Sequence, residues 1–295
     1  MKPVLLIVNP ASGTCQGGKR LSEIASVFQN GGFLPTVLMT QKSGDATEFA
    51  KKWAADFPMV VCVGGDGTFS ETLSGLLASG AQVPIGYIPA GSTNDLASTL
   101  KLSSNIVTAA QAVVDGSPQW MDVGRFGGRC FAYTASFGVF TKTAYNTPQD
   151  LKNTLGYLAY VLEGIRDLAT IQPVHMNIDV NGEHLEGDYI FGAVCNSTSL
   201  GGIIQLDSNV VDLNDGLLEL LLIKTPTTPI ELAKMIHALH TKQYDSCESI
   251  RFLSTQEIRI RTDHPGFMWT LDGEPLESGQ DTLIRNVHDA YRIIL

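Results

Sequence analysis

The sequence lacks any apolar stretch long enough to cross a membrane as a helix, which takes about 20 residues. The apolar run at residues 217–223 is interrupted by Glu219. The stretch at residues 4–8 is shorter than the apolar core of a signal peptide, which needs at least about seven residues. We therefore expect neither a transmembrane span nor a targeting segment.

Basic residues are also scarce, because 20 lysines and arginines face 30 aspartates and glutamates, for a net charge of −10. A nucleic-acid-binding protein normally presents a basic face, so this balance argues against that class. It argues equally against strong electrostatic attachment to an anionic membrane.

Cysteines are few and scattered, and no pair has the Cys-x-x-Cys spacing. Their odd number and irregular spacing argue against a disulfide framework and against a zinc site. A reducing, cytoplasmic environment fits this pattern. The five are Cys15, Cys62, Cys130, Cys195 and Cys247.

What is present is enough apolar sequence for two domains, with 295 residues of which 44% are hydrophobic. In the first third, short apolar runs alternate with helical patterns, which predicts a doubly wound α/β domain over residues 1–120 with a parallel sheet. Asp45 and Glu48 have the spacing of a capping box for a helix that reaches residue 56. Strands are expected at residues 4–8, 34–39, 59–63 and 85–88.

After Gly116 strand-like runs dominate, which predicts an antiparallel, β-rich second domain over residues 121–280. Two helices are expected in it, at residues 153–168 and 229–240. Residues 281–295 fit against either domain. The expected strands cover residues 120–126, 129–137, 175–180, 189–196, 217–223, 250–260 and 268–271.

The most informative motif is Gly64-Gly65-Asp66-Gly67-Thr68, at the junction of an apolar strand and a helix. Glycines there let the backbone turn sharply and approach a ligand. The N–H groups at a helix N-terminus favour phosphate, and an acid among them suits magnesium. A tight turn alone is the simpler interpretation, and a dinucleotide-binding motif is disfavoured because Ser70 stands at its third glycine.

A second glycine-rich loop, residues 13–19, has the glycine and lysine spacing of a P-loop. Arg20 stands where that motif needs a hydroxyl for magnesium, so a flexible turn is the simpler interpretation. This loop follows a strand, as the loop at residues 64–68 does. The carboxyl ends of parallel strands meet at one edge of a sheet. The sequence therefore predicts one shared cleft.

Three further segments accompany the Gly-Gly-Asp-Gly-Thr motif in a characteristic order. They are Asn-Pro-Ala-Ser-Gly at 9–13, Ile-Pro-Ala-Gly-Ser-Thr-Asn-Asp at 88–95 and Leu-Asp-Gly-Glu at 271–274. In these motifs the sequence resembles, over essentially its whole length, the bacterial soluble diacylglycerol kinase and lipid kinase family, which is related to sphingosine kinases and NAD kinases. The resemblance implies that ATP and Mg²⁺ bind between the two domains, and that the γ-phosphate passes to diacylglycerol or a similar lipid in phospholipid biosynthesis. It further implies transient contact with the membrane surface, and it allows a homodimer.

The same resemblance assigns site residues. Glu274 falls on the catalytic base, and Asp272 on an acid associated with the catalytic magnesium. If residues 272–274 are extended, both side chains point to one side, whereas Asp-Gly is also a common hairpin turn. The ATP-binding residues implied are Asn9, Pro10, Ala11, Ser12, Gly13, Thr40, Gly65, Asp66, Gly67, Thr68, Phe69, Ser70, Glu71 and Ser92.

A structural magnesium site is also implied by the resemblance, at residues 212–217. Its ligands would be the main-chain carbonyls of Asp212 and Leu217 and the carboxylate of Asp215. Asn214 stands where the family usually has another acid.

Two alternatives remain. The chain could phosphorylate a soluble hydroxyl compound such as NAD, or it could be a catalytically silent nucleotide-binding regulator, against which the intact Glu274 argues. His237 and His240 share a helix face but lack an evident third metal ligand. The sequence does not indicate which lipid is used.

Overall fold

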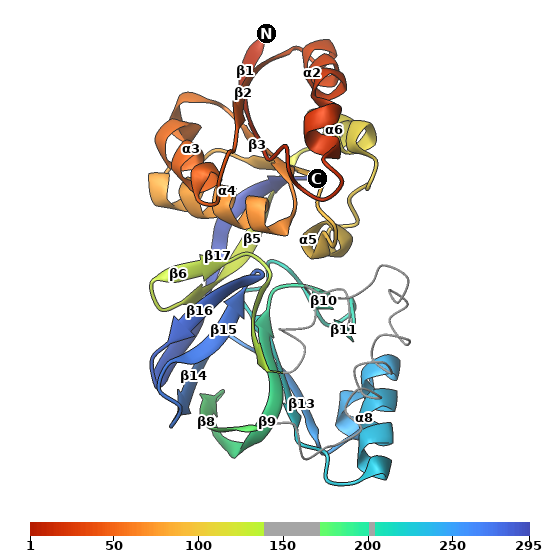
Figure 1. The fold of residues 1–295 in the computed structure, drawn as a ribbon, viewed down its shortest axis with the longest axis vertical. Coiled ribbons are helices and arrows are strands. Elements are labelled where there is room, and N and C mark those ends of the chain that lie inside the picture. The colour runs from red at the N-terminus through yellow and green to blue at the C-terminus, as the bar shows by residue number, and fades with distance from the viewer. Residues whose placement is uncertain (139–171, 201–203) are drawn as a thin grey trace. The chain divides into compact units, whose positions relative to one another are not determined.

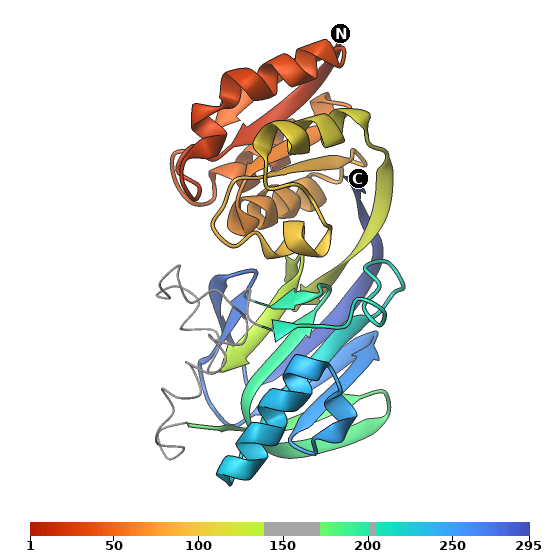
Figure 2. The ribbon, with the colours of Figure 1, turned by 90° about the vertical axis from the view of Figure 1, so that its right-hand side faces the viewer.

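The computed structural model describes residues 1–138, 172–200 and 204–295, drawn in Figures 1 and 2. The chain forms two units, Met1–Val123 together with His288–Leu295, and Gly124–Val287. The helix predicted at residues 153–168 lies outside the described residues. No helix in the described part of the chain is both long and apolar enough to span a bilayer.

The first unit is built on a parallel sheet, as the alternating pattern predicted. Its strands are β1 (Lys2–Val8), β2 (Phe33–Met39), β3 (Val60–Gly64) and β4 (Ile85–Pro89), in the order β4-β3-β1-β2. All five residues of β3 and of β4 are buried. This continuous burial is typical of parallel strands that are covered on both faces.

Helices cover both faces of that sheet (Figure 1). On one face α2 packs on α6, and on the other α3 packs on α4. The helices of this unit are α1 (Gln16–Lys19), α2 (Leu21–Asn30), α3 (Asp45–Trp53), α4 (Asp66–Ser79), α5 (Asp95–Thr99) and α6 (Ile106–Asp115), with a 3₁₀ turn η1 (Ala54–Asp56).

The capping box predicted at Asp45 is wrong. Gly44 is the N-cap of α3, and Asp45 is its first helical residue. The Asp45 carboxylate instead accepts hydrogen bonds from the backbone N–H groups of Gln41 and Lys42, at 2.7 and 3.0 Å. A positive φ of 88° at the N-cap suits glycine, which explains why the cap lies one residue earlier.

Two long strands, β5 (Pro118–Phe126) and β17 (Asp281–Ile294), have residues in both units. The end of β17 belongs to the first unit, where Ile293 pairs in parallel with Ile85 of β4. Residues of β17 beyond Val287 therefore complete the sheet of the first unit.

The second unit is β-rich and antiparallel, as predicted. The run expected at 129–137 is two strands, and the run at 250–260 is broken at Gln256. Helix α8 lies along the sheet in Figure 2 and buries Met235, Ala238 and Leu239 against it. The further elements are β6 (Arg129–Phe131), β7 (Thr134–Gly138), β8 (Val174–Val180), β9 (Glu183–Cys195), β10 (Ser199–Leu200), β11 (Ile204–Gln205), β12 (Leu218–Lys224), α8 (Pro229–Thr241), η4 (Tyr244–Ser246), β13 (Ile250–Thr255), β14 (Glu257–Thr262), β15 (Phe267–Leu271) and β16 (Glu274–Ser278).

Candidate functional site

Three loops of the first unit meet at the carboxyl edge of its parallel sheet, where one shared cleft was predicted. They follow β1, β3 and β4, and each contributes a glycine to a close backbone contact. A side-chain carbon added at Gly91 would lie 2.5 Å from the Cα of Gly65. One added at Gly13, whose φ is +53°, would lie 2.6 Å from the carbonyl oxygen of Ala90. Only glycine allows the three loops to come this close.

Side chains of the first loop tie it to the second. The Asn9 amide donates to the Thr68 hydroxyl at 3.0 Å. The backbone N–H of Gly65 donates to the Ser12 hydroxyl at 3.3 Å. These contacts bring the segment at 9–13 beside the N-terminus of α4, a helix of 14 residues. The first-turn N–H groups of such a helix have no partner within it and form a natural phosphate site.

Asp66 joins the second loop to the third. Its carboxylate accepts hydrogen bonds from the backbone N–H groups of Asp95, at 2.9 Å, and Leu96, at 3.2 Å. The Tyr87 hydroxyl lies 3.5 Å from the same carboxylate. Burial, and then the charge of Asp66, raise the pKa of Tyr87 well above its usual value. Asp66 therefore caps α5 as well as lying among the glycines.

Asn94 shapes the third loop, although it was not among the predicted site residues. It has a left-handed φ of 54°, a conformation that asparagine tolerates better than most residues. Its side chain bonds twice to Gly91, accepting from the N–H and donating to the carbonyl, both at 3.0 Å. The sequence feature that could have indicated this role is the position of Asn94 three residues after Gly91, in the loop that follows β4.

The remaining residues predicted to bind ATP lie in different environments. Glu71 accepts hydrogen bonds from the Ser43 hydroxyl and the Gly44 N–H, so it holds the loop after β2 against α4. Thr40, at the end of β2, is buried. Phe69 is fully buried with its ring 4.8 Å from that of Tyr87, so its side chain belongs to the core. Ser92 and Ala11 are exposed, whereas Pro10, Gly67 and Ser70 are half-buried.

In the second unit, Asp272 and Gly273 form the two-residue turn of the hairpin between β15 and β16. Both have positive φ, 47° and 90°, and Leu271 pairs with Glu274 across the turn. The extended arrangement considered for residues 272–274 is therefore wrong, because Asp-Gly adopts the turn that favours such hairpins. Glu274 is the first residue of β16 and is exposed.

The Asp272 carboxylate is buried and accepts three backbone hydrogen bonds. Its donors are the N–H groups of Ala132, at 2.6 Å, and of Tyr133 and Thr134, each at 3.0 Å. These bonds fix the turn that carries Glu274 to the segment that leads into β7. Asp272 thus positions the hairpin, whatever further partner its oxygens take.

The loop predicted to hold a structural magnesium precedes β12. Asp215 and Asp212 are exposed, and their carboxylates accept hydrogen bonds from the N–H groups of Leu217, at 2.9 Å, and Asn214, at 3.0 Å. The Leu217 carbonyl accepts from the Asn286 amide at 2.9 Å. A carbonyl oxygen has a second lone pair, so this contact leaves Leu217 able to bind a cation.

One acidic residue beside this loop was not predicted as part of any site. Glu219 is fully buried, and among the described residues neither of its carboxylate oxygens has a hydrogen-bond partner. Burial, and then the charge of Asp215, raise the pKa of Glu219 to about 8. Its signal in the sequence was an acid within an otherwise apolar strand.

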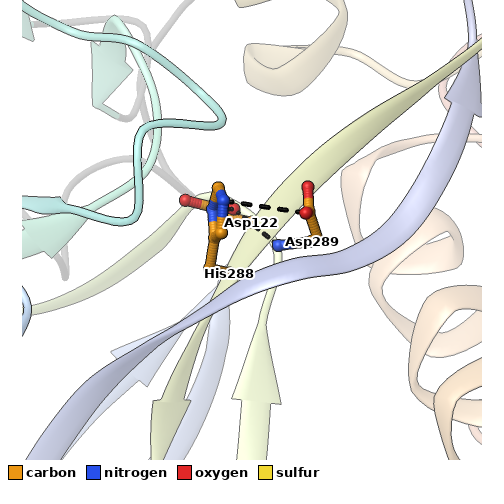
Figure 3. Close-up of side chains that lie close together, drawn as sticks. All are labelled: Asp122, His288 and Asp289. Carbon is orange, nitrogen blue, oxygen red and sulfur yellow. Dashed lines mark hydrogen bonds and ion pairs between the residues drawn. The ribbon is translucent and has the colours of Figure 1, made fainter.

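A histidine and two acids cluster in the first unit (Figure 3). The buried Asp122 carboxylate lies 2.8 Å from His288 Nδ1 and accepts from the Asp289 N–H at 3.0 Å. His288 Nε2 lies 3.6 Å from the Asp289 carboxylate. Among the described residues, these three are the side-chain group with metal-ligand spacing. In this conformation Asp122 orients the imidazole and ties β5 to β17.

Each of the two units matches a known protein family model. Residues 3–126 match the family model of the diacylglycerol kinase catalytic domain, and residues 134–288 match that of the YegS C-terminal NAD kinase beta sandwich-like domain. These matches fall on the two units that carry the loops and the hairpin described above.

Individual proteins that resemble this chain carry the same family description as the match to the first unit. The diacylglycerol kinase of Bacillus subtilis (strain 168) is 34% identical over 228 residues, which are 76% of this chain and 74% of that protein. That of Staphylococcus carnosus (strain TM300) is 28% identical over 89% of this chain and 88% of that protein. The crystal structure of a candidate diacylglycerol kinase from Bacillus anthracis strain Sterne superposes with a TM-score of 0.81 at 26% identity, covering 99% of this chain and 95% of that one. The chain belongs to the bacterial diacylglycerol kinase family, with a YegS-like C-terminal domain.

Proposed function

We propose that this chain is an ATP-dependent lipid kinase that transfers the γ-phosphate to the hydroxyl of diacylglycerol or a similar lipid, giving phosphatidic acid or its analogue. The observation that carries the proposal is the bond between Asp66 and the backbone of α5. It joins the two glycine-containing motifs typical of the family at one edge of the sheet. Membership of the family supports the reaction class.

The first unit supplies the nucleotide site in this proposal. The glycines at 13, 65 and 91 leave a backbone surface that a side chain would fill, and α4 presents its N–H groups beside it. Such a surface fits the phosphates of ATP. Asn9 and Ser12 hold this surface in place. The family resemblance also assigns Thr40, Glu71 and Ser92 to the ATP-binding residues. Phe69 would act through the core, because its side chain is buried.

Magnesium, when bound, supplies neutralisation of the phosphate charge. Asp66 and Asp272 are the acids proposed to serve it, and both already accept backbone hydrogen bonds. A carboxylate has about four lone-pair positions, so these bonds do not by themselves exclude a further partner. A second, structural magnesium is proposed at the loop of residues 212–217, where oxygen donors suit a hard cation.

Glu274 is the proposed general base. Its exposed carboxylate stands next to the turn that Asp272 fixes, so its backbone position is defined while the side chain remains accessible. The carboxylate would take the proton of the lipid hydroxyl, as that oxygen bonds to the γ-phosphorus and ADP leaves. Because Asp66 and Glu274 belong to different units, the reaction requires residues of both.

The lipid must be reached at a membrane surface by a cytoplasmic enzyme that attaches reversibly. The net charge of −10 makes a broad electrostatic attachment unfavourable, so local contacts would hold the protein there. Turnover should therefore rise when the lipid is presented in vesicles or mixed micelles rather than as monomers.

A phosphorylation screen with labelled ATP tests the proposal. The acceptors are diacylglycerol, phosphatidylglycerol, sphingoid bases, undecaprenol and NAD, with each lipid in mixed micelles. We expect labelled product from diacylglycerol or another of these lipids. Strong NAD phosphorylation without lipid phosphorylation would instead support a soluble-substrate kinase. ATP binding without any turnover would support a silent regulator.

A further inference from the structure

Glu219 presents a physical problem that the kinase reaction does not explain. Its side chain is completely buried, and both carboxylate oxygens lack a hydrogen-bond donor among the described residues. Buried carboxylates are normally paired, hydrogen-bonded or bound to a metal, because an isolated buried charge is very unfavourable. An unsatisfied group of this kind points to a partner that the protein chain itself does not supply.

The position of Glu219 shows where that partner must lie. Cys195 is its partner across the antiparallel ladder, so the two side chains project to the same face of the sheet. Cys195 lies in the core that includes Val211, and Leu213 packs against that core. The loop of residues 212–217, through Leu213, therefore packs on the face of the sheet to which Glu219 projects.

Glu219 and the loop of residues 212–217 together hold several oxygen acceptors. The amide oxygen of Asn214 in the loop is buried and also lacks a hydrogen-bond partner among the described residues. Asp215 and then Asp212 are close enough to act on Glu219 electrostatically. The groups that favour the ionised form are its own backbone N–H and then the hydroxyl of Ser254, its partner on the neighbouring strand β13. Several oxygens that share so few donors form a set suited to a hard cation such as Mg²⁺ or Ca²⁺.

We propose that Glu219 is a direct, buried ligand of the cation held by the loop of residues 212–217. The inference rests on the structural magnesium site of the proposed function, and adds to it an acid from within a strand. The cation neutralises the buried carboxylate, and the carboxylate links the loop to the sheet beneath it. The cation would therefore stabilise the second unit as a whole, rather than only its loop.

The first test is thermal unfolding of the full chain in EDTA and in millimolar MgCl₂. The wild-type midpoint should rise with magnesium, because a ligand that binds only the native state stabilises it. Glu219→Gln should unfold at a higher temperature than the wild type in EDTA, since it replaces a buried carboxyl group that has no hydrogen-bond partner with an amide that cannot ionise, and its midpoint should not rise with magnesium. Glu248→Gln, which changes an exposed glutamate of the same unit, should behave as the wild type.

A magnesium-induced rise of wild-type size in Glu219→Gln would overturn the proposal, and so would the absence of any rise in the wild type. Mn²⁺ titration should show affinity at least ~10-fold weaker in Glu219→Gln, since losing even an outer-shell partner costs about this much. Neither measurement involves ATP or lipid, so an inactive kinase would not affect the outcome.

If Glu219→Gln does not fold, wild-type crystals soaked in MnCl₂ decide the question. An anomalous peak within about 2.6 Å of a Glu219 carboxylate oxygen is expected, the range for oxygen ligands of such cations. A peak at Asp215 with the Glu219 carboxylate turned away, or no peak at this loop, would overturn the proposal.

Discussion

The carboxylate of Asp66 accepts a hydrogen bond from the backbone N–H of Asp95, at 2.9 Å and across 29 residues of sequence. Asp66 lies in the loop after β3, and Asp95 begins the helix that follows β4. The bond makes the two motifs parts of one structure, so a change in either should affect both.

Asp66→Asn tests this link. The amide retains one acceptor oxygen and loses the other, so one N–H of α5 is left without its acceptor. We expect a loss of about 1–3 kcal/mol in the free energy of unfolding, the usual cost of an unsatisfied buried donor. ATP affinity, measured by calorimetry, should fall in the protein that remains folded. Asp56→Asn, at an exposed acid of the same unit, should leave both quantities unchanged. Undiminished ATP affinity in Asp66→Asn would place the nucleotide elsewhere.

Gly91→Ala tests the close approach of the loops. The added methyl would lie 2.5 Å from the Cα of Gly65 and 2.8 Å from the Asn94 amide oxygen, so the loops must separate. Weaker ATP binding is expected, with a smaller effect on the unfolding temperature than on affinity, because the loops lie at the edge of the core. Gly128→Ala is the matched control, since a methyl there meets no atom within 4 Å. Equal ATP affinity in the two variants would count against a glycine-lined phosphate site.

The sequence was sufficient to predict the fold class because its periodicities are local. The buried strands β1, β3 and β4 are continuous apolar runs, and the glycines that end them mark the edge where the loops meet. Helix α5 was not predicted, because five residues are too few to show a helical period and its N-terminus is capped by Asp66 from a distant loop. Gly44 was missed as a cap because its left-handed conformation is not visible in composition.

The site could be predicted as motifs but not as contacts. Asp272 and Glu274 stood out in the sequence, yet nothing in it indicated that Asp272 would accept bonds from three backbone groups some 140 residues earlier. Glu219 was visible only as an interruption of an apolar strand. Its burial depends on the packing of the second unit around it, which is a tertiary relationship that no local pattern encodes.

Glu231 gives a prediction about pH. Its carboxylate accepts bonds from the Thr227 N–H and the Ser249 hydroxyl, each at 2.7 Å, and these hold the N-terminus of α8. The Thr227 backbone bond contributes most to lowering the pKa of Glu231 to about 2. A lowered folded-state pKa stabilises the protein above the unfolded value of about 4.5, and that stabilisation is lost as the pH falls towards about 2.

Chemical denaturation of wild type and Glu231→Gln across this pH range measures the effect. The wild type should be the more stable of the two at neutral pH, and the difference should shrink steadily below about pH 4.5. Glu248→Gln, at an exposed glutamate, should show no such trend. A difference between wild type and Glu231→Gln that does not change with pH would mean that the ionised carboxylate does not hold α8.

The turnover of Glu274→Gln on the best lipid acceptor tests the proposed mechanism most directly. Glutamine keeps the size of the side chain and removes its basicity, and loss of a general base typically lowers the rate ~10²–10⁴-fold, or ~3–5 kcal/mol of barrier. ATP affinity should stay at the wild-type value, because the base contacts the acceptor. Glu277→Gln, at an exposed glutamate on the same strand, should retain wild-type turnover. If Glu274→Gln retained most of its turnover, Glu274 would not be the base and the proposed mechanism would be wrong.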